Sequence, residues 1–184
     1  MTLTETPICN FGEKAKNFNL LSTENKKISL NNVQGENGTL IMFICNHCPY
    51  VKAVIKDIVE DAKYLKNLGI KSVAIMSNDV KNYPEDSFEN MISFSKIHNF
   101  PFSYLIDETQ EVAKDYGAVC TPDFFGYNKD NELQYRGRIR ELKNLKAVRK
   151  DDSDLRVAMK QIATSGIGPK KQIPSMGCNI KWFK

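Results

Sequence analysis

The sequence lacks several features that would assign it to a special class of protein. No apolar run approaches the roughly 18 residues that a membrane-spanning helix needs. The segment Met1–Asn10 is polar and has neither the basic start nor the apolar centre of a secretory signal peptide, so we expect a cytoplasmic protein. Histidine is scarce, with only His47 and His98, which argues against a His-rich metal site.

Charge of either sign is modest as well. The 184 residues carry a net charge of +4, and 41% are hydrophobic, which excludes a disordered chain and a general nucleic-acid-binding protein. Seven of the basic residues, with one acid, are concentrated in residues 136–150. We expect a solvated loop there, with a short helix on Leu142, Leu145 and Val148. The alternative is a docking patch for an acidic partner.

Hydrophobic periodicity predicts alternating strands and helices. The order favours one α/β domain over residues 1–184, in which a mixed sheet carries helices on both faces. An N-terminal strand pair lies in an extension at 1–38, and a tail at 167–184 docks through Ile180 and Trp182. The predicted strands are 18–21, 27–30, 39–44, 70–76, 102–106, 123–127 and 133–137, and the predicted helices are 51–68, one from Pro84, 108–116 and one from Asp152 or Ser153 to Gly166.

The pair of cysteines in Cys45-Asn46-His47-Cys48 directly follows a predicted strand and precedes a long helix with Pro49 in its first turn. This is the arrangement of thioredoxin-type redox proteins. We expect the helix N-terminus and His47 to stabilise a thiolate on Cys45, which attacks a disulfide, and Cys48 to resolve the mixed disulfide. Two inert core cysteines, or part of a metal site that includes His47, are the alternatives.

The remaining cysteines receive weaker predictions. Cys120 precedes Thr121-Pro122, a position at which thioredoxin-like chains have a cis proline that faces the dithiol. Cys120 is therefore either a third redox thiol or a small buried hydrophobic residue. Cys178, in the tail, is a candidate resolving thiol, although we favour a packing role for it. Cys9 is assigned no role.

The chain resembles the thioredoxin-fold proteins grouped with peroxiredoxins as alkyl hydroperoxide reductase/thiol-specific antioxidant (AhpC/TSA) proteins, and within them a peroxiredoxin-like branch. The resemblance implies a three-layer thioredoxin-like fold, antioxidant or redox activity without a cofactor, and partner binding at the cis-Pro122 loop with Thr121, Asn46 and Pro49. The segments that carry it are Cys45–Val51, Ser77–Asp79, Tyr83–Ser87, Asp107–Gln110, Tyr116–Phe125, Tyr135–Ile139 and Pro174–Trp182.

The sequence also departs from these families. Peroxiredoxins carry Pro-x-x-x-Thr-x-x-Cys-Pro, and here Ile41 and Cys45 stand at the Pro and Thr positions before Cys48. Thr39 stands where thioredoxins place a buried acid. We therefore predict a thiol–disulfide oxidoreductase that acts on protein or small-molecule disulfides, without a metal and without nucleic-acid or membrane partners. A thiol peroxidase that uses Cys48, with Cys45 or Cys178 resolving, is the second hypothesis, and a metal-binding module is the third.

Overall fold

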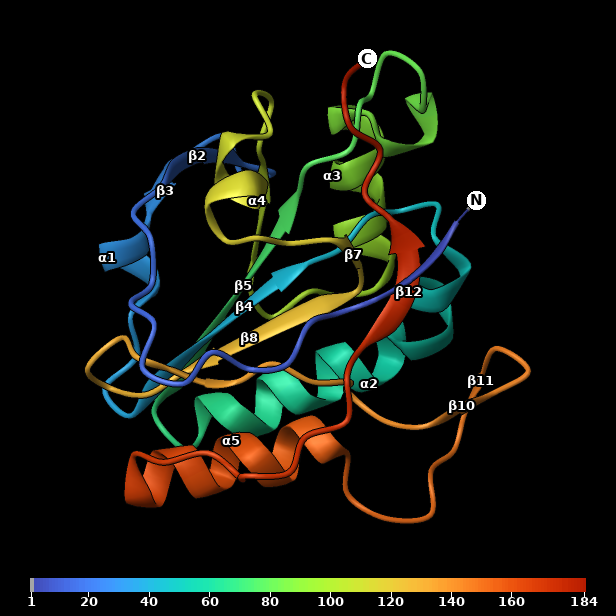
Figure 1. Ribbon diagram of the computed structural model, residues 1–184. Helices are drawn as coiled ribbons and strands as arrows, with labels where there is room; N and C mark the ends of the chain where they lie inside the picture. Colours follow the sequence, from blue (N-terminus) through green and yellow to red (C-terminus); the bar gives the residue numbers. More distant parts are fainter. Residues whose placement is uncertain (1) are drawn as a thin grey trace.

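The computed structural model describes residues 2–184 and is built around a mixed sheet of seven strands (Figure 1). In order across the sheet these are β3 (Lys27–Ser29), β2 (Asn19–Ser22), β6 (Ser103–Ile106), β5 (Ile70–Met76), β4 (Gly38–Phe43), β8 (Asp123–Tyr127) and β9 (Leu133–Tyr135). β4, β5 and β6 run parallel, and the outer pairings are antiparallel.

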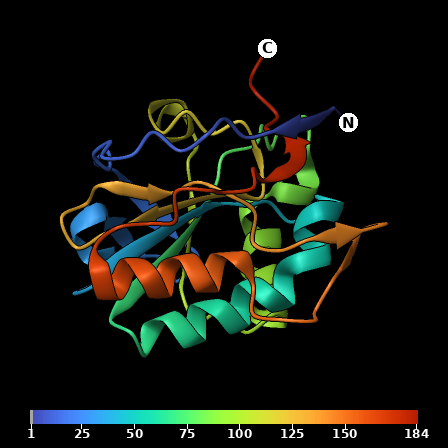
Figure 2. The ribbon, with the colours of Figure 1, turned by 60° about the horizontal axis from the view of Figure 1, so that its bottom comes forward.

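Helices cover both faces of this sheet, as predicted. One face carries α2 (Pro49–Lys66), α3 (Phe88–Ile97) and α5 (Asp154–Ser165), and the other carries α1 (Leu30–Val33) and α4 (Glu111–Asp115). Side chains alternate along β4, so that Leu40 and Met42 join the core under α2 while Ile41 and Phe43 join the core under α4. Figure 2 shows α2 and α5 side by side beneath the sheet.

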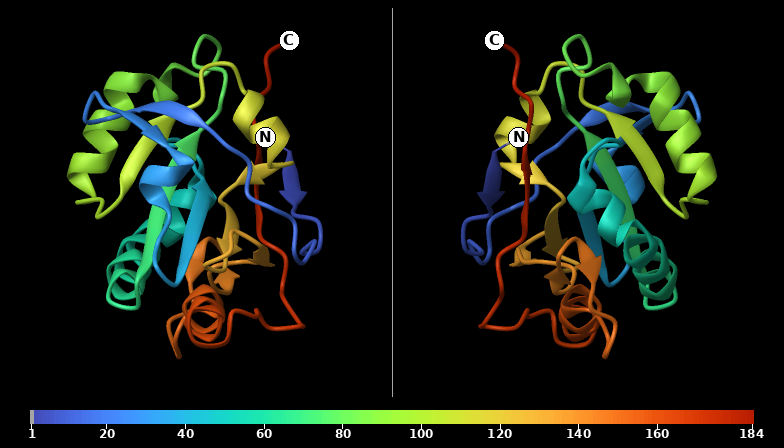
Figure 3. Two further views of the ribbon diagram at one scale, coloured as in Figure 1. Left: turned by 90° about the vertical axis from the view of Figure 1, so that its left-hand side faces the viewer. Right: turned by 90° about the vertical axis from the view of Figure 1, so that its right-hand side faces the viewer.

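A second, smaller sheet joins the two ends of the chain. Its strand order is β1 (Leu3–Glu5), β12 (Met176–Asn179) and β7 (Cys120–Thr121), with β12 in the middle (Figure 3). The sequence pattern did not predict β1 or β12 as strands. Ile180 is buried as expected, whereas Trp182 lies beyond β12, remains 37% exposed and contacts the protein through the Lys114 ammonium, which lies 5.9 Å from the centre of its ring.

The basic segment also differs from its prediction. Instead of a helix on Leu142, Leu145 and Val148, it forms the hairpin β10 (Leu142–Lys143) and β11 (Lys146–Ala147). Asn144 and Leu145 at its turn have φ angles of 49° and 56°, and the tight two-residue hairpin turn requires positive φ at both positions.

Several arginines of residues 136–150 neutralise acids within the protein. Arg140 and Arg149 both pair with Asp57 of α2, and Arg136 pairs with the fully buried Asp123. Arg138 also pairs with Asp154, so the four arginines among the seven basic residues of this segment are all paired with acids of the protein, which counts against a docking patch for an acidic partner. No helix within the described residues 2–184 is long and apolar enough to cross a bilayer.

The segment after β5 places residues beside the Cys45–Cys48 segment. The predicted helix from Pro84 is two elements, a 3₁₀ turn η1 (Pro84–Asp86) and then α3. The hydroxyl of Ser87 accepts the N–H of Asn90 and so caps α3. As a result Asp86, the last residue of η1, is fully buried and contacts the loop between β4 and α2.

Candidate active site

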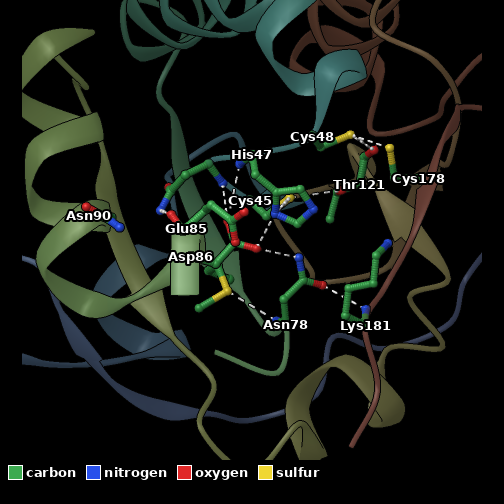
Figure 4. A network of polar contacts seen from close by, with 12 residues as sticks. Cys45, His47, Cys48, Asn78, Glu85, Asp86, Asn90, Thr121, Cys178 and Lys181 are labelled. Carbon is green, nitrogen blue, oxygen red and sulfur yellow. Dashed lines mark hydrogen bonds and ion pairs between the residues drawn. The ribbon is translucent and has the colours of Figure 1, made fainter. Parts of the chain in front are cut away.

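The two cysteines of the Cys45–Cys48 segment lie between the end of β4 and the start of α2 (Figure 4). Cys48 is the N-cap residue of α2, and Pro49 occupies the first turn, where its missing N–H costs nothing. Both cysteines are almost completely buried, Cys45 with 1% and Cys48 with 0% of its surface exposed. A reacting partner must therefore approach through a small opening or displace a neighbouring segment.

Cys48 lies at the centre of a group of sulfur and oxygen atoms. Its Sγ is 3.0 Å from Sγ of Cys178 and 3.1 Å from the carbonyl oxygen of Thr121. A hydrogen bond from the Cys45 thiol lowers the pKa of Cys48 to about 5 against the effect of burial, and the Cys178 thiol and the N–H of Val51 contribute further hydrogen bonds. Cys48 is thus the sulfur that the helix N-terminus stabilises as a thiolate.

The Cys45 sulfur has different neighbours. Its Sγ lies 3.4 Å from the hydroxyl of Thr121 and 3.9 Å from Nδ1 of His47. Burial raises the pKa of the Cys45 thiol well above its usual range, and its hydrogen bond to Cys48 raises it further. The directions of the two pKa shifts favour the resting thiolate on Cys48, whereas the sequence-based prediction placed it on Cys45. The helix begins immediately after Cys48, so its unpaired N–H groups reach Cys48 first.

A buried carboxylate, Asp86, holds the loop that contains both cysteines. Its Oδ1 accepts the backbone N–H groups of Asn46 and His47 at 2.8 and 3.2 Å, and its Oδ2 accepts from Nδ2 of Asn78 at 2.8 Å. Nδ1 of His47 lies 2.7 Å from the same Oδ2. Burial opposes ionisation, but the hydrogen bonds from His47 and Asn78 outweigh it and lower the pKa of Asp86. Asp86 in turn raises the pKa of His47, which favours the imidazolium form beside Cys45.

Sequence reasoning missed Asp86 and the contribution of the tail. The backbone N–H of Lys181 donates to Oδ1 of Asn78 at 2.8 Å, and its ammonium lies over the ring of Tyr83, which stacks on His47. Tyr83 and Asp86 belong to Tyr83–Ser87, one of the segments in which the sequence resembles the family. Nothing in the sequence, however, places that segment beside Cys45, because the contact joins separate elements of the chain, and Asn46 and Asp86 are separated by 40 positions.

The predicted partner-binding residues are brought to the site, but their polar groups are engaged within the protein. The Thr121–Pro122 peptide is cis, as predicted. Thr121 contacts both sulfurs of the pair and forms the strand that β12 covers. Asn46 donates to the carbonyl of Glu85 and accepts from the hydroxyl of Tyr104, so its side chain stabilises the loop. Pro49 is half-buried.

The other three cysteines differ in their distance from the Cys45–Cys48 pair and in their surroundings. Cys178 lies against Cys48, whereas Cys120 donates to the carbonyl oxygen of Pro122 at 3.6 Å. Burial raises the pKa of Cys120 far above the ordinary value, which makes it a poor nucleophile. Burial also raises the pKa of Cys9, to about 11, at a half-buried position outside the site.

A metal could be held by Cys45, His47 and Asp86, whose ligand atoms lie within 4.8 Å of one another. Sulfur, imidazole nitrogen and carboxylate oxygen are all ligands that zinc accepts. Oδ2 of Asp86, however, already accepts from Asn78 and contacts His47. A cation would have to replace these contacts, so the donor set fits a metal less well than it fits a hydrogen-bonded redox pair.

The charge of His47 leads to a testable pH dependence. We expect the ultraviolet absorbance of the thiolate in the reduced protein to titrate near the Cys48 pKa of about 5. The thiolate and the imidazolium attract each other, so His47→Asn should raise this midpoint. It should also make the Cys45–Cys48 couple more reducing, by about 30 mV for each unit of pKa. His98→Asn is the matched control, and an equal titration curve for His47→Asn would contradict the assigned role.

Comparison with known families now assigns the chain to a class. The AhpC/TSA family model matches residues 11–140, and the chain belongs to this family. No curated protein matches the chain. An uncharacterised conserved protein of Geobacillus kaustophilus has a very similar crystal structure, with 40% identity and a TM-score of 0.93 over 100% of this chain and 97% of that one.

Two redox proteins of Mycobacterium tuberculosis share the fold at lower identity. The peroxidoxin BcpB matches with 15% identity and a TM-score of 0.56, covering 67% of this chain and 81% of its own. A secreted disulfide oxidoreductase homologous to DsbE of Escherichia coli matches with 19% identity and a TM-score of 0.54, covering 64% and 80%. The fold is thioredoxin-like, and family and fold together indicate a role in thiol redox chemistry.

Proposed function

We propose that this protein is a thiol–disulfide oxidoreductase that cycles Cys45 and Cys48 between a dithiol and a disulfide. The observation that carries the proposal is the placement of Cys48 as the N-cap residue of α2 with Cys45 beside it, where Thr121 contacts both sulfurs. Disulfide exchange requires one thiolate and a second sulfur within reach, and this pair supplies both. Protein or low-molecular-weight disulfides of a reducing, cytoplasmic environment are the partners that fit it.

In the first half of the proposed reaction, Cys45 is the attacking sulfur and Cys48 accepts its proton. Cys45 lies next to His47, whose side chain is 13% exposed and forms the more open edge of the site. When a partner disulfide approaches, Cys45 passes its proton along the hydrogen bond to Cys48 and attacks one partner sulfur. The imidazolium of His47 and the hydroxyl of Thr121 stabilise the transient Cys45 thiolate.

The low pKa of Cys48 serves the second half. The departing partner thiolate takes the proton from Cys48, which again becomes a thiolate and attacks Sγ of Cys45. The Cys45–Cys48 bond forms, the mixed disulfide breaks, and the second partner sulfur leaves as a thiolate. Cys48 thus acts both as base and as resolving nucleophile, which compensates for the absence of a buried acid at Thr39.

A thiol peroxidase is the second candidate, and the Cys48 pKa of about 5 is the observation that favours it. Cys48 would be oxidised by a peroxide to a sulfenic acid, which Cys45 or Cys178 would condense with, releasing water. Against this, the carbonyl oxygen of Thr121 faces the sulfur, and Ile41 has no polar group to position a peroxide. Peroxide reduction requires donors for the departing oxygen, whereas disulfide exchange does not.

An assay of two activities tests the proposal. The reduced protein should accelerate the reduction of insulin by a dithiol, while its oxidation by hydrogen peroxide in stopped flow should be no faster than that of free cysteine. Fast peroxide consumption that survives Cys45→Ser but is lost in Cys48→Ser would establish the peroxidase instead. Metal content of protein purified without a histidine tag tests the metal-binding alternative, which requires one bound ion per chain.

A further inference from the structure

The tail strand β12 brings a third sulfur to the redox pair. In the small sheet, Cys178 is paired with Leu3 of β1 on one side and with Thr121 of β7 on the other. Its side chain is nearly completely buried, and its Sγ lies 3.0 Å from Sγ of Cys48 (Figure 4). The backbone pairing on both sides holds this sulfur in place, so it reaches Cys48 without any rearrangement of the chain.

Gly177 makes this close approach of the two strands possible. A Cβ atom at Gly177 would lie 2.0 Å from the carbonyl oxygen of Thr121 and 3.1 Å from the nitrogen of Pro122. No side chain fits at that distance, so β12 can approach β7 this closely only with glycine here. The contact between Cys178 and Cys48 therefore depends on a backbone approach as well as on the two thiols.

We propose that Cys178 is a third redox thiol, and that Cys48 is the shared member of two alternative disulfides, Cys45–Cys48 and Cys48–Cys178. This inference rests on the proposed function, which supplies the first disulfide. Sγ of Cys48 contacts Sγ of Cys178 directly, and the Cys45 and Cys48 sulfurs both contact Thr121, so either partner sulfur lies beside Cys48.

The step between the two disulfides is an internal exchange that needs no outside oxidant. Sulfur of Cys178 attacks Sγ of Cys48, the Cys48–Cys178 bond forms, and the Cys45–Cys48 bond breaks. Cys45 leaves as a thiolate and takes the proton that Cys178 releases, so the number of electrons and protons is unchanged. Burial raises the pKa of the Cys178 thiol to about 12, so Cys178 attacks only as its proton passes to the departing Cys45. Lys181, three residues further along the tail, partly offsets the effect of burial by favouring negative charge on Cys178.

The exchange has a structural consequence at the partner-binding strand. A Cys48–Cys178 bond holds β12 against β7, the strand that contains Thr121. The family resemblance places the partner backbone at this strand. The same step returns Cys45 to a thiol beside His47. The protein thereby keeps its disulfide in a form in which β12 of the tail is covalently held beside β7.

Disulfide mapping in a glutathione redox buffer tests this inference, with all variants made in a Cys9→Ser/Cys120→Ser background. We expect Cys45→Ser to lose two titratable thiols and to yield the Cys48–Cys178 peptide on mass spectrometry. Cys48→Ser should keep both of its remaining thiols, because the shared sulfur is gone. If Cys45→Ser retains two thiols in a buffer that fully oxidises the unsubstituted background, Cys178 is not a redox thiol.

Two further variants separate this inference from the proposed function. Gly177→Ala keeps every sulfur but separates the strands, and an overpacking cost of about 1–3 kcal/mol corresponds to a roughly 5- to 160-fold lower ratio of Cys48–Cys178 to Cys45–Cys48 disulfide. An unchanged ratio would count against the geometry. Suppose that Cys178→Ser forms the Cys45–Cys48 disulfide and reduces insulin, while Cys45→Ser forms no Cys48–Cys178 disulfide. The proposed function then stands, and only the internal exchange to Cys178 is contradicted. If instead Cys45→Ser forms the Cys48–Cys178 disulfide, while Cys178→Ser neither forms the Cys45–Cys48 disulfide nor reduces insulin, the third redox thiol is supported and the proposed function is contradicted.

Discussion

Replacement of either member of the redox pair, Cys45→Ser or Cys48→Ser, is expected to reduce insulin-reductase turnover to the uncatalysed background, a loss on the order of 10³-fold or more. The two variants should fail at different steps. Cys48→Ser retains the attacking sulfur but has no resolving thiolate, so it should accumulate a mixed disulfide between Cys45 and the partner. Cys45→Ser retains Cys48 but has no attacking sulfur, so it should form no such adduct.

Because the two sulfurs act as one unit, the double variant should be no worse than either single variant. Cys120→Ser is the matched control, since Cys120 is also buried near Pro122 but donates its thiol to a backbone carbonyl. Its turnover should stay within about twofold of the original, well under the tenfold that 1.4 kcal/mol represents. A partner trapped on Cys48 in the Cys45→Ser variant would make Cys48 the attacking sulfur and Cys45 the resolving one.

The Arg136→Met variant is expected to lose about 3–5 kcal/mol of unfolding free energy, the cost of leaving a buried charge without its partner. Asp123 is fully buried, and the guanidinium of Arg136 donates to it at 3.0 and 3.4 Å. Arg136 also donates to the carbonyl of Gly117 and lies over the ring of Phe125. The loop before the Thr121–Pro122 peptide should therefore loosen with it. Urea denaturation followed by circular dichroism measures the loss.

Two variants control for this result. Lys143→Met removes a surface charge whose side chain is 71% exposed, and it should change stability by no more than about 0.5 kcal/mol. Asp123→Asn added to Arg136→Met removes the unpaired charge and should restore part of the loss. Equal stability of Arg136→Met and the unsubstituted protein would show that solvent reaches Asp123 and that the pair is not buried in solution.

Much of the fold could be predicted because its signals are local. The unbroken apolar run of β4, the three- and four-residue spacing in α2, and the turn between β8 and β9 each depend on neighbouring residues. The predictions failed where long-range pairing decides the structure. β1 and β12 are short strands that only pairing with each other and with β7 stabilises, so neither has a pattern of its own. The hairpin at 142–147 depends on two residues with positive φ, Asn144 and Leu145, and leucine there gives no turn signal.

The sequence by itself determined that two cysteines stand between a buried strand and a helix, with a histidine between them and an X-Pro bond at the expected later position. These are properties of residue order and spacing. Only the tertiary structure decided which sulfur lies nearer the helix N-terminus and which groups surround each sulfur, because both depend on the residue at which the helix begins and on segments distant in the chain. It also decided that Asp86 contacts the loop containing both cysteines and that Cys178 contacts Cys48. Cys178 is 130 positions from Cys48, and their contact exists because strand pairing, which no local pattern encodes, closes the chain upon itself.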